Sequence, residues 1–251
     1  MPDVVYKYYS FNEYSLDALL TNRVWLSKPS SFNDPFDCAL TRDIIAHNKE
    51  RDAYFEAMRS MPGKEKDMSA ISRAPVPEWV LSVGISDLRN KLDSIGVCSF
   101  SEQNKSILMW SHYADRHRGF CIEYDCSYGS SLHSELQRVE YANRIPLITI
   151  KDYNRSDNEK KKAYVARLAI LKSPEWSYEK EWRLVKEYNN AYYERMLKIK
   201  AVYFGARMPD DKRLEIMELI KDRAQKPEIG FFQIVRSADA FELSELFITS
   251  T

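Results

Sequence analysis

Short segments with the two-residue period of strands, separated by amphipathic helical segments, most constrain how this chain folds. Val4 to Tyr9 is rich in β-branched and aromatic residues, which favour a half-buried strand. Asn12 is a suitable cap for a helix carrying Leu16, Leu19 and Leu20. Further strands are expected over 24–26, 96–100, 120–124, 178–183, 197–204 and 231–235, and helices over 106–114, 210–224 and after the polar stretch 154–162 to near 172. The pattern predicts one mixed α+β domain over residues 1–251 with about seven strands.

One long helical stretch interrupts this pattern. Residues 44–95 are amphipathic with a helical period, broken at Pro62-Gly63, Pro75 and Pro77. A segment of roughly 50 residues is too short for a confident core of its own. We therefore expect a helical insertion within the domain.

Composition and missing motifs exclude several classes of protein. The 37 basic and 37 acidic residues balance, which removes any global electrostatic case for nucleic-acid or membrane-surface binding. No apolar run approaches the roughly 18 residues of a spanning helix, and the start MPDVVYKYYS lacks the apolar stretch of a signal peptide. The four scattered cysteines predict reduced thiols in the cytoplasm. No glycine-rich nucleotide-binding loop, G-x-S-x-G elbow or H-E-x-x-H helix occurs.

The segment YEKEWR carries the clearest chemical signal. If it is a strand, Glu179, Glu181 and Arg183 share one face, while Tyr178 and Trp182 lie on the other. Two neighbouring carboxylates can divide roles, one staying anionic while the other orients a hydroxyl or accepts a proton. The alternative is a surface ladder of ion pairs.

The loop SFNDPFD presents Asn33, Asp34 and Asp37 between aromatic residues. Such a loop can offer hydrogen-bond acceptors to a ribose or a metal. It can equally form a turn in which Asn and Asp satisfy their own backbone.

Two further segments offer candidate side chains. In MWSHYADRHRG, His112 and His117 are five residues apart, which does not place two metal ligands on one helix face, so a metal site is not expected. His112 is either catalytic or structural. In the first strand Lys7 faces away from Tyr6 and Tyr8, an arrangement that suits ring stacking and phosphate neutralisation, or a core strand with a lysine reaching solvent.

Three blocks, FNDPFD, MWSHYA and YEKEWR, occur in the order found in an uncharacterised bacterial and phage family. The chain resembles this family, a domain of unknown function with the number twenty-nine seventy-one, over about Tyr6 to Gly205. Tyr9 departs from the family pattern, which favours an arginine there, and this puts in doubt any phosphate contact at that position.

The layout of the segments also resembles that of ADP-ribosyltransferases. The resemblance implies a mostly antiparallel core with NAD as substrate, Glu181 as the catalytic glutamate and Glu179 as its upstream partner. It implies Lys7 and Tyr8 at the NAD site, and Ser99 and Ser101 in the central serine motif. We expect His112 to assist catalysis and Asn33, Asp34, Tyr113 and Arg183 to complete the NAD site.

The expected activity is ADP-ribosyl transfer or NAD cleavage by a toxin or phage-defence effector, with no metal. Its acceptor would be a protein or a nucleic acid, and its partner an antitoxin or another defence component. One alternative is a metal-dependent nuclease using Asp34, Asp37, Glu179 and Glu181, with Lys172 or Lys180 near the phosphate. Another is a non-catalytic sensor or binding module.

Overall fold

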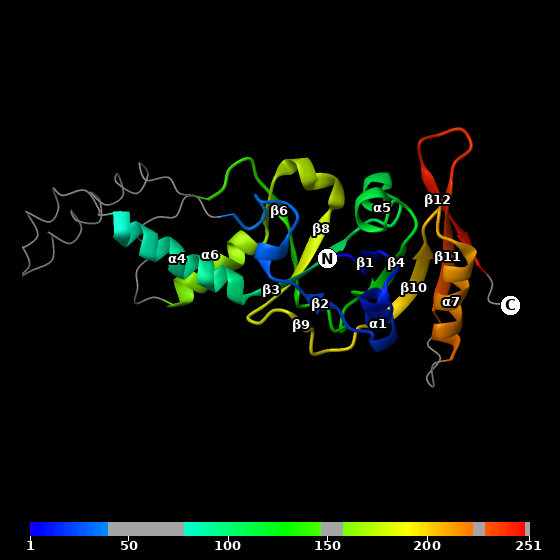
Figure 1. Cartoon of the computed structure of the whole chain (residues 1–251), viewed down its shortest axis with the longest axis horizontal. Coiled ribbons are helices and arrows are strands. Elements are labelled where there is room, and N and C mark those ends of the chain that lie inside the picture. Colours follow the sequence, from blue (N-terminus) through cyan, green and yellow to red (C-terminus); the bar gives the residue numbers. More distant parts are fainter. Residues whose placement is uncertain (40–77, 147–157, 223–228, 249–251) are drawn as a thin grey trace, which may run out of the picture. The chain divides into compact units, whose positions relative to one another are not determined.

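The computed structural model describes residues 1–39, 78–146, 158–222 and 229–248 (Figure 1). Its packing divides the chain into two compact units, each assembled from segments that are distant in sequence. The first unit comprises Met1–Ser27, Gly96–Val139 and Pro174–Thr251, and the second comprises Lys28–Ile95 and Glu140–Ser173.

An eight-stranded sheet forms the first unit, in the order β12-β11-β10-β4-β1-β3-β8-β5 (Figure 1). Its strands are β1 (Val4–Tyr9), β3 (Gly96–Ser101), β4 (Phe120–Asp125), β5 (Leu136–Arg138), β8 (Glu181–Lys186), β10 (Ile199–Phe204), β11 (Gly230–Arg236) and β12 (Leu243–Phe247). Only the β10–β11 pair of this sheet is parallel. A short antiparallel ladder joins β2 (Trp25–Leu26) to β9 (Ala191–Tyr192). The predicted fold class, mixed α+β with a mostly antiparallel sheet, is confirmed.

One face of this sheet packs against α1 (Glu13–Thr21) and α7 (Asp210–Lys221). The Asn12 side chain accepts a hydrogen bond from the Ser15 backbone, which confirms the predicted cap. Asn22 ends α1 in the left-handed conformation. The core on this face contains Leu19 of α1, Ile216 of α7, and Phe120, Ile122 and Tyr124 of β4. The two-residue spacing of these three residues along β4 places their side chains on one face of the sheet.

The opposite face of the sheet is covered in part by α5 (Ile107–Tyr113). Ser106 caps this helix by accepting a hydrogen bond from the Met109 backbone. Trp110 is fully buried, and its indole donates a 2.6 Å hydrogen bond to the Asn104 carbonyl. Tyr8 and Cys121 belong to the same buried cluster. The helix is therefore fixed against the sheet, which positions Tyr113 at its last turn.

The second unit contains the helices α4 (Glu78–Ser94) and α6 (Asn158–Ala169), the 3-10 turn η1 (Pro29–Ser31), and the parallel pair β6 (Glu140–Tyr141) and β7 (Leu171–Lys172). α4 and α6 pack against each other, and Lys161 of α6 lies 3.0 Å from the Asp87 carboxylate of α4. Lys161 is only 4% exposed, so this lysine of the charged stretch lies in the interior and not on a solvated helix face.

Several element boundaries predicted from the sequence differ from those in the structure. Residues 44–77 of the expected insertion 44–95 lie outside the described residues, while α4 confirms a helix in its last part. The interpretation as one domain stays a prediction. The helix expected to end near 172 ends at Ala169, because β7 begins at Leu171. The strands β5, β6, β7 and β9 were not predicted, because two or three residues are too few to show a two-residue period. β12 was not predicted either, and its residues are mostly exposed.

Candidate functional site

The main candidate site lies at the start of β8, where two polar residues share one face of the sheet. Ser101 of β3 pairs with Glu181, and Ser99 pairs with Arg183. Residues paired across strands project from the same face, so these four side chains lie together. This is the same face as Tyr8 and α5, since Tyr6 pairs with Ser101 across β1 and β3.

Glu181 and Arg183 form a bidentate ion pair on this face. Arg183 Nε lies 2.7 Å from Glu181 Oε1, and Nη2 lies 3.1 Å from Oε2. The residues are 3% and 1% exposed, respectively. Two parallel hydrogen bonds to a buried guanidinium hold the Glu181 carboxylate as an oriented anion.

Glu179 is not part of the strand, which corrects the prediction for 178–183. It ends the 3-10 helix η2 (Pro174–Glu179), and Lys180 follows in the left-handed conformation with φ of 44°. This turn breaks the two-residue period, and the strand begins only at Glu181. Glu179 is nevertheless 3% exposed, and its carbonyl accepts a 2.6 Å hydrogen bond from the Ser101 hydroxyl.

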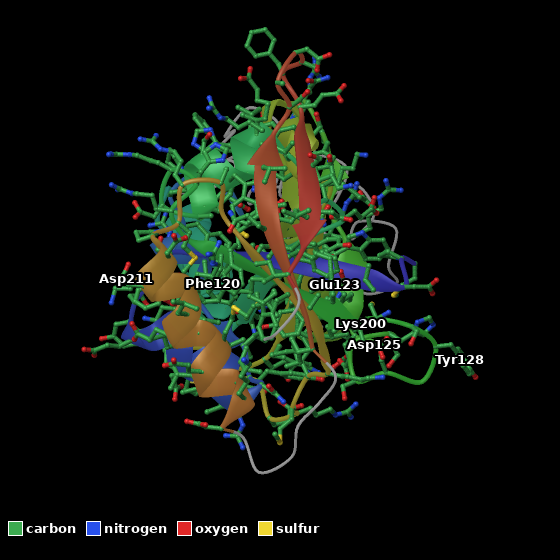
Figure 2. The ribbon with its side chains drawn as sticks, turned by 90° about the vertical axis from the view of Figure 1, so that its right-hand side faces the viewer. Phe120, Glu123, Asp125, Tyr128, Lys200 and Asp211 are labelled. Carbon is green, nitrogen blue, oxygen red and sulfur yellow. The ribbon has the colours of Figure 1, made fainter. Side chains whose placement is uncertain are left out.

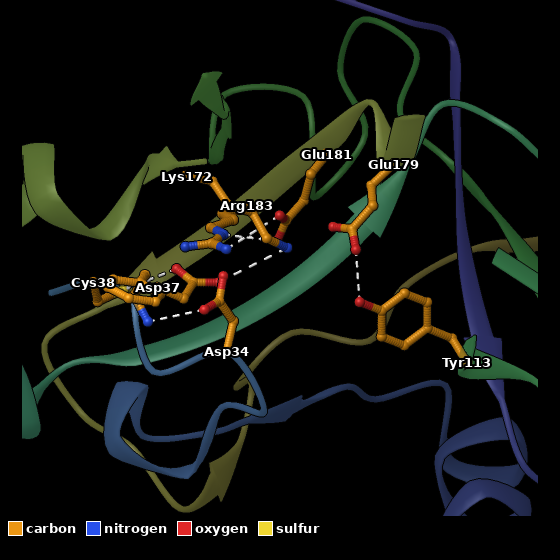
Figure 3. A network of polar contacts seen from close by, with 9 residues as sticks. Asp34, Asp37, Cys38, Tyr113, Lys172, Glu179, Glu181 and Arg183 are labelled. Atoms are coloured by element: carbon orange, nitrogen blue, oxygen red, sulfur yellow. Dashed lines mark hydrogen bonds and ion pairs between the residues drawn. The ribbon is translucent and has the colours of Figure 1, made fainter. Parts of the chain in front are cut away.

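Tyr113 orients the Glu179 carboxylate, as Figure 3 shows. Its hydroxyl donates a 2.6 Å hydrogen bond to Glu179 Oε1. Burial, followed by this hydrogen bond, raises the pKa of Tyr113 well above the ordinary value for a tyrosine. The hydroxyl therefore remains a donor at physiological pH. Tyr178 is half-buried in η2, and its backbone carbonyl accepts a 3.1 Å hydrogen bond from the Gln103 side-chain amide.

His112 lies on the exposed side of the same corner. Its ring centroid is 6.2 Å from that of Tyr113 and 6.5 Å from that of Tyr178. The structure therefore brings His112 near Tyr113, within the group predicted from the sequence.

The structure does not give Tyr8 and Lys7 the positions expected of residues that bind NAD. The Tyr8 ring packs edge-on against Trp110, and its hydroxyl donates a 2.6 Å hydrogen bond to the Gln103 carbonyl. Tyr8 is 8% exposed, so it is a core residue. Lys7 alternates to the other face, where its ammonium lies 3.1 Å from the Ser99 carbonyl and 5.7 Å from the Phe100 ring centre. The structure does not bring the Lys7 ammonium together with the side chain of Glu181.

The FNDPFD loop belongs to the second unit. Asn33 is exposed, and Asp34 accepts a 2.9 Å hydrogen bond from the Phe36 backbone, as in an Asx-turn. The Asp37 carboxylate lies 3.8 Å from the Lys172 ammonium, and these side chains are 5% and 7% exposed. Cys38 follows in the left-handed conformation with its thiol against Asp37 (Figure 3). All four cysteines of the chain are free, as predicted.

The sequence missed a second carboxylate on the Glu181 face, Glu123 of β4 (Figure 2). Its Oε2 accepts a 2.6 Å hydrogen bond from the Tyr203 hydroxyl. Burial raises the pKa of Tyr203 and of Tyr6, and the neighbouring Glu123 raises both further. The period of two residues along β4 places Glu123 on the face opposite Ile122, but the β4–β10 register is needed to bring Tyr203 to it.

Neither a metal-binding cluster nor a membrane-spanning helix occurs among the described residues. Among residues 1–39, 78–146, 158–222 and 229–248, no three His, Cys, Asp or Glu side chains are grouped so that they could hold a metal ion. None of the helices described is both long and apolar enough to cross a membrane.

The fold and the site define a mixed α+β protein with two buried glutamates, Glu179 at the end of η2 and Glu181 at the start of β8. Residues 109–184 match the model of a family described as protein of unknown function, DUF2971. This match includes the MWSHYA and YEKEWR blocks and supports the resemblance found in the sequence. No curated protein matches the chain, and no solved structure matches it either. The resemblance in layout to ADP-ribosyltransferases stays a prediction.

Proposed function

We propose that this protein is an ADP-ribosyltransferase-like enzyme that cleaves the nicotinamide–ribose bond of NAD on the face that carries Glu179 and Glu181. The observation that carries the proposal is the burial of both carboxylates, each 3% exposed, beside specific donors from Tyr113 and Arg183. The location of the enzyme would be the cytoplasm.

Burial of two acidic side chains demands an explanation beyond stability. Removing a carboxylate from water costs on the order of several kcal/mol, and a buried ion pair is often no more stabilising than apolar residues of similar size. Such arrangements are concentrated at functional sites, where charge is held in a fixed orientation. An enzyme that stabilises a developing positive charge has a use for fixed anions in a poorly hydrated setting.

Cleavage of NAD generates such a charge. As the C–N bond breaks, its electron pair leaves with nicotinamide, which becomes neutral, and the ribose acquires oxocarbenium character. An acceptor nucleophile, either water or a macromolecular side chain, then bonds to the anomeric carbon and loses its proton. Glu181 supplies the stabilising anion, and Glu179, oriented by Tyr113, accepts a hydrogen bond from a ribose hydroxyl.

The surrounding residues suggest how the nicotinamide would be held. Tyr8 is in the core, so the stacking role assigned to it from the sequence passes to Tyr178 or Tyr113, which are half-buried. His112, exposed next to both rings, is placed to exchange a proton with the acceptor.

Release of nicotinamide from NAD by the purified full chain tests the proposal. We expect release that is reduced at least about 100-fold by Glu181→Gln and by Glu179→Gln. Glu218→Gln, which alters an exposed glutamate of α7, should leave the rate unchanged. Thermal unfolding of each variant shows whether the fold is retained.

Three outcomes would count against the proposal. Wild-type protein that releases no nicotinamide, with or without candidate protein and nucleic-acid acceptors, contradicts it. Nucleic-acid cleavage that requires Mg²⁺ and is abolished by EDTA would favour the nuclease. A biological effect that survives Glu181→Gln would favour the sensor module.

A further inference from the structure

The second unit contains a cavity that the proposed catalytic site does not use. Its volume is about 620 Å³, within the range of small-molecule sites. The loop after β6, the end of α6, β7 and the residues Phe36 and Ala39 line it. All of these residues belong to the second unit.

The backbone around this cavity is held in place by the β6–β7 pair. The Glu140 backbone donates a 2.7 Å hydrogen bond to the Ile170 carbonyl, and the Ala142 backbone donates a 3.0 Å bond to the Lys172 carbonyl. Tyr164 of α6 donates its hydroxyl to the Pro146 carbonyl at 3.2 Å. Residues 142–146, which follow β6, are thus tied to β7 at Ala142 and to α6 at Pro146.

The charges that line the cavity are of one sign. Arg144 and Lys172 are its charged residues among the described lining, and none of the others is acidic. Lys172 is 9% exposed, and its ammonium is partly offset by Asp37 at 3.8 Å. Arg144 is exposed and makes no side-chain hydrogen bond or ion pair with any described residue. Because the whole chain has no net charge, two cations on one cavity are a local feature.

The rest of the lining is mainly apolar. Leu168 is 1% exposed and provides a floor, while Phe36 remains 67% exposed and Ile145 36% exposed at the mouth. Large apolar side chains left in water are stabilised when a ligand covers them, by about 25 cal/mol per Å². An aromatic ring at the mouth suits stacking on a flat ligand.

We propose that this cavity binds an organic phosphate of nucleotide size, with the phosphate at Arg144 and Lys172 and the base against Phe36. A guanidinium presents a fork of donors that matches two phosphate oxygens, and a lysine adds a compact charge. The proposal does not rest on NAD cleavage, because the proposed reaction uses none of the residues that line this cavity.

Isothermal titration calorimetry of the full chain tests this proposal, with AMP, GMP, CMP and UMP as probes. We expect at least one of them to bind, and its nucleoside and inorganic phosphate to bind at least about tenfold more weakly. Ribose 5-phosphate separates recognition of the base from recognition of the sugar phosphate. Equal affinity for ribose 5-phosphate and for the nucleotides would overturn the role given to Phe36 and the nucleotide assignment.

Two variants locate the bound nucleotide without disturbing the buried Lys172–Asp37 pair. Arg144→Gln removes the exposed guanidinium and should weaken binding at least about tenfold. Ala142→Trp fills the cavity and should abolish binding. Arg236→Gln, an exposed arginine of the first unit, is the matched control and should leave binding unchanged.

Glu179→Gln separates this site from the proposed catalytic site and should leave nucleotide binding unchanged. Absence of binding by all four nucleotides at about 1 mM overturns the proposal. Binding that persists undiminished in both Arg144→Gln and Ala142→Trp, with their folds intact by circular dichroism, overturns it as well. Loss of binding in Glu179→Gln would place the nucleotide at the proposed catalytic site and would also overturn the proposal.

Discussion

The hydroxyl of Tyr113, at the end of α5, lies 2.6 Å from Oε1 of Glu179, at the end of η2. The two residues are 66 positions apart in the chain, and both lie within the segment that matches DUF2971. This hydrogen bond links the helix that covers the sheet to the turn that precedes β8. It gives the Glu179 carboxylate a fixed orientation.

Tyr113→Phe removes that hydroxyl while keeping the ring. Because a hydrogen bond to a charged group contributes about 1.5–3 kcal/mol, we expect NAD cleavage to fall by about 10- to 100-fold. Nicotinamide release gives the rate, and urea denaturation gives the stability. An unchanged rate would show that Tyr113 does not position Glu179 for the reaction. A matched control is Tyr128→Phe, in the turn after β4, where the side chain is 92% exposed and projects into solvent (Figure 2).

Arg183→Met is expected to destabilise the fold by about 3–5 kcal/mol, because it leaves the Glu181 carboxylate buried without its bidentate partner. Urea unfolding monitored by tryptophan fluorescence measures this change. Adding Glu181→Gln to that variant should recover part of the loss, since the uncompensated charge is removed. The exposed pair Lys212–Glu215 provides the comparison, and Lys212→Met should cost less than about 1 kcal/mol. Equal losses of unfolding free energy for Arg183→Met and Lys212→Met would contradict the assignment of Arg183 and Glu181 as a buried ion pair.

Trp182→Ala should destabilise the protein by about 3 kcal/mol or more, because the ring is 8% exposed within the core. Its indole also donates a 2.7 Å hydrogen bond to Glu102. Trp182→Phe retains most of the buried apolar area and should destabilise the protein less than Trp182→Ala does. Thermal unfolding of the three proteins orders them, and an intact melting temperature for Trp182→Ala would mean that the two faces of β8 are assigned wrongly.

Asp125 should contribute to stability in a pH-dependent way. Hydrogen bonding by the Ser127 hydroxyl, assisted by the Ser127 backbone and Lys198, lowers the pKa of the Asp125 carboxyl. A carboxyl whose pKa is lower when folded stabilises the protein above its unfolded pKa of about 3.9. That contribution is lost as the pH falls through the folded pKa. Asp125→Asn should therefore be less stable than wild type at pH 6, and the gap should narrow toward pH 3 in thermal unfolding. A gap that is constant with pH would contradict this linkage.

Local sequence patterns anticipated much of the first unit. The boundaries of β1 and the caps of α1 depend on interactions within a few residues, so they could be predicted. The pairing of Glu181 with Arg183 likewise follows from the two-residue period of one strand. The strand β12 was missed because its residues are mostly exposed and its hydrogen bonds come from β11, which no local pattern encodes.

The candidate site could be predicted only in part. The sequence identified Glu179 and Glu181 but placed both on one strand. In the structure Lys180, which lies between them, adopts the left-handed conformation and breaks the two-residue period, so only Glu181 is in the strand. The side chains of Lys7 and Tyr8 project from opposite faces of the sheet, as expected. The sequence of the strand alone does not show which of these faces packs against α5. The packing of Trp110 against Tyr8 decides it and leaves Tyr8 in the core.

The amino-acid sequence by itself determined most of the local elements and the alternation of side chains along each strand, because these depend on residues close in the chain. The tertiary structure alone decided that Tyr113 meets Glu179, that Tyr203 meets Glu123, and that Lys172 meets Asp37. Each of these contacts joins residues more than 60 positions apart. Strand register brings Tyr203 to Glu123, and the packing of helices and turns brings the other two pairs together. Neither depends on residues that are neighbours in the chain, and the backbone hydrogen bonds that set the register are chemically the same whichever residues they pair.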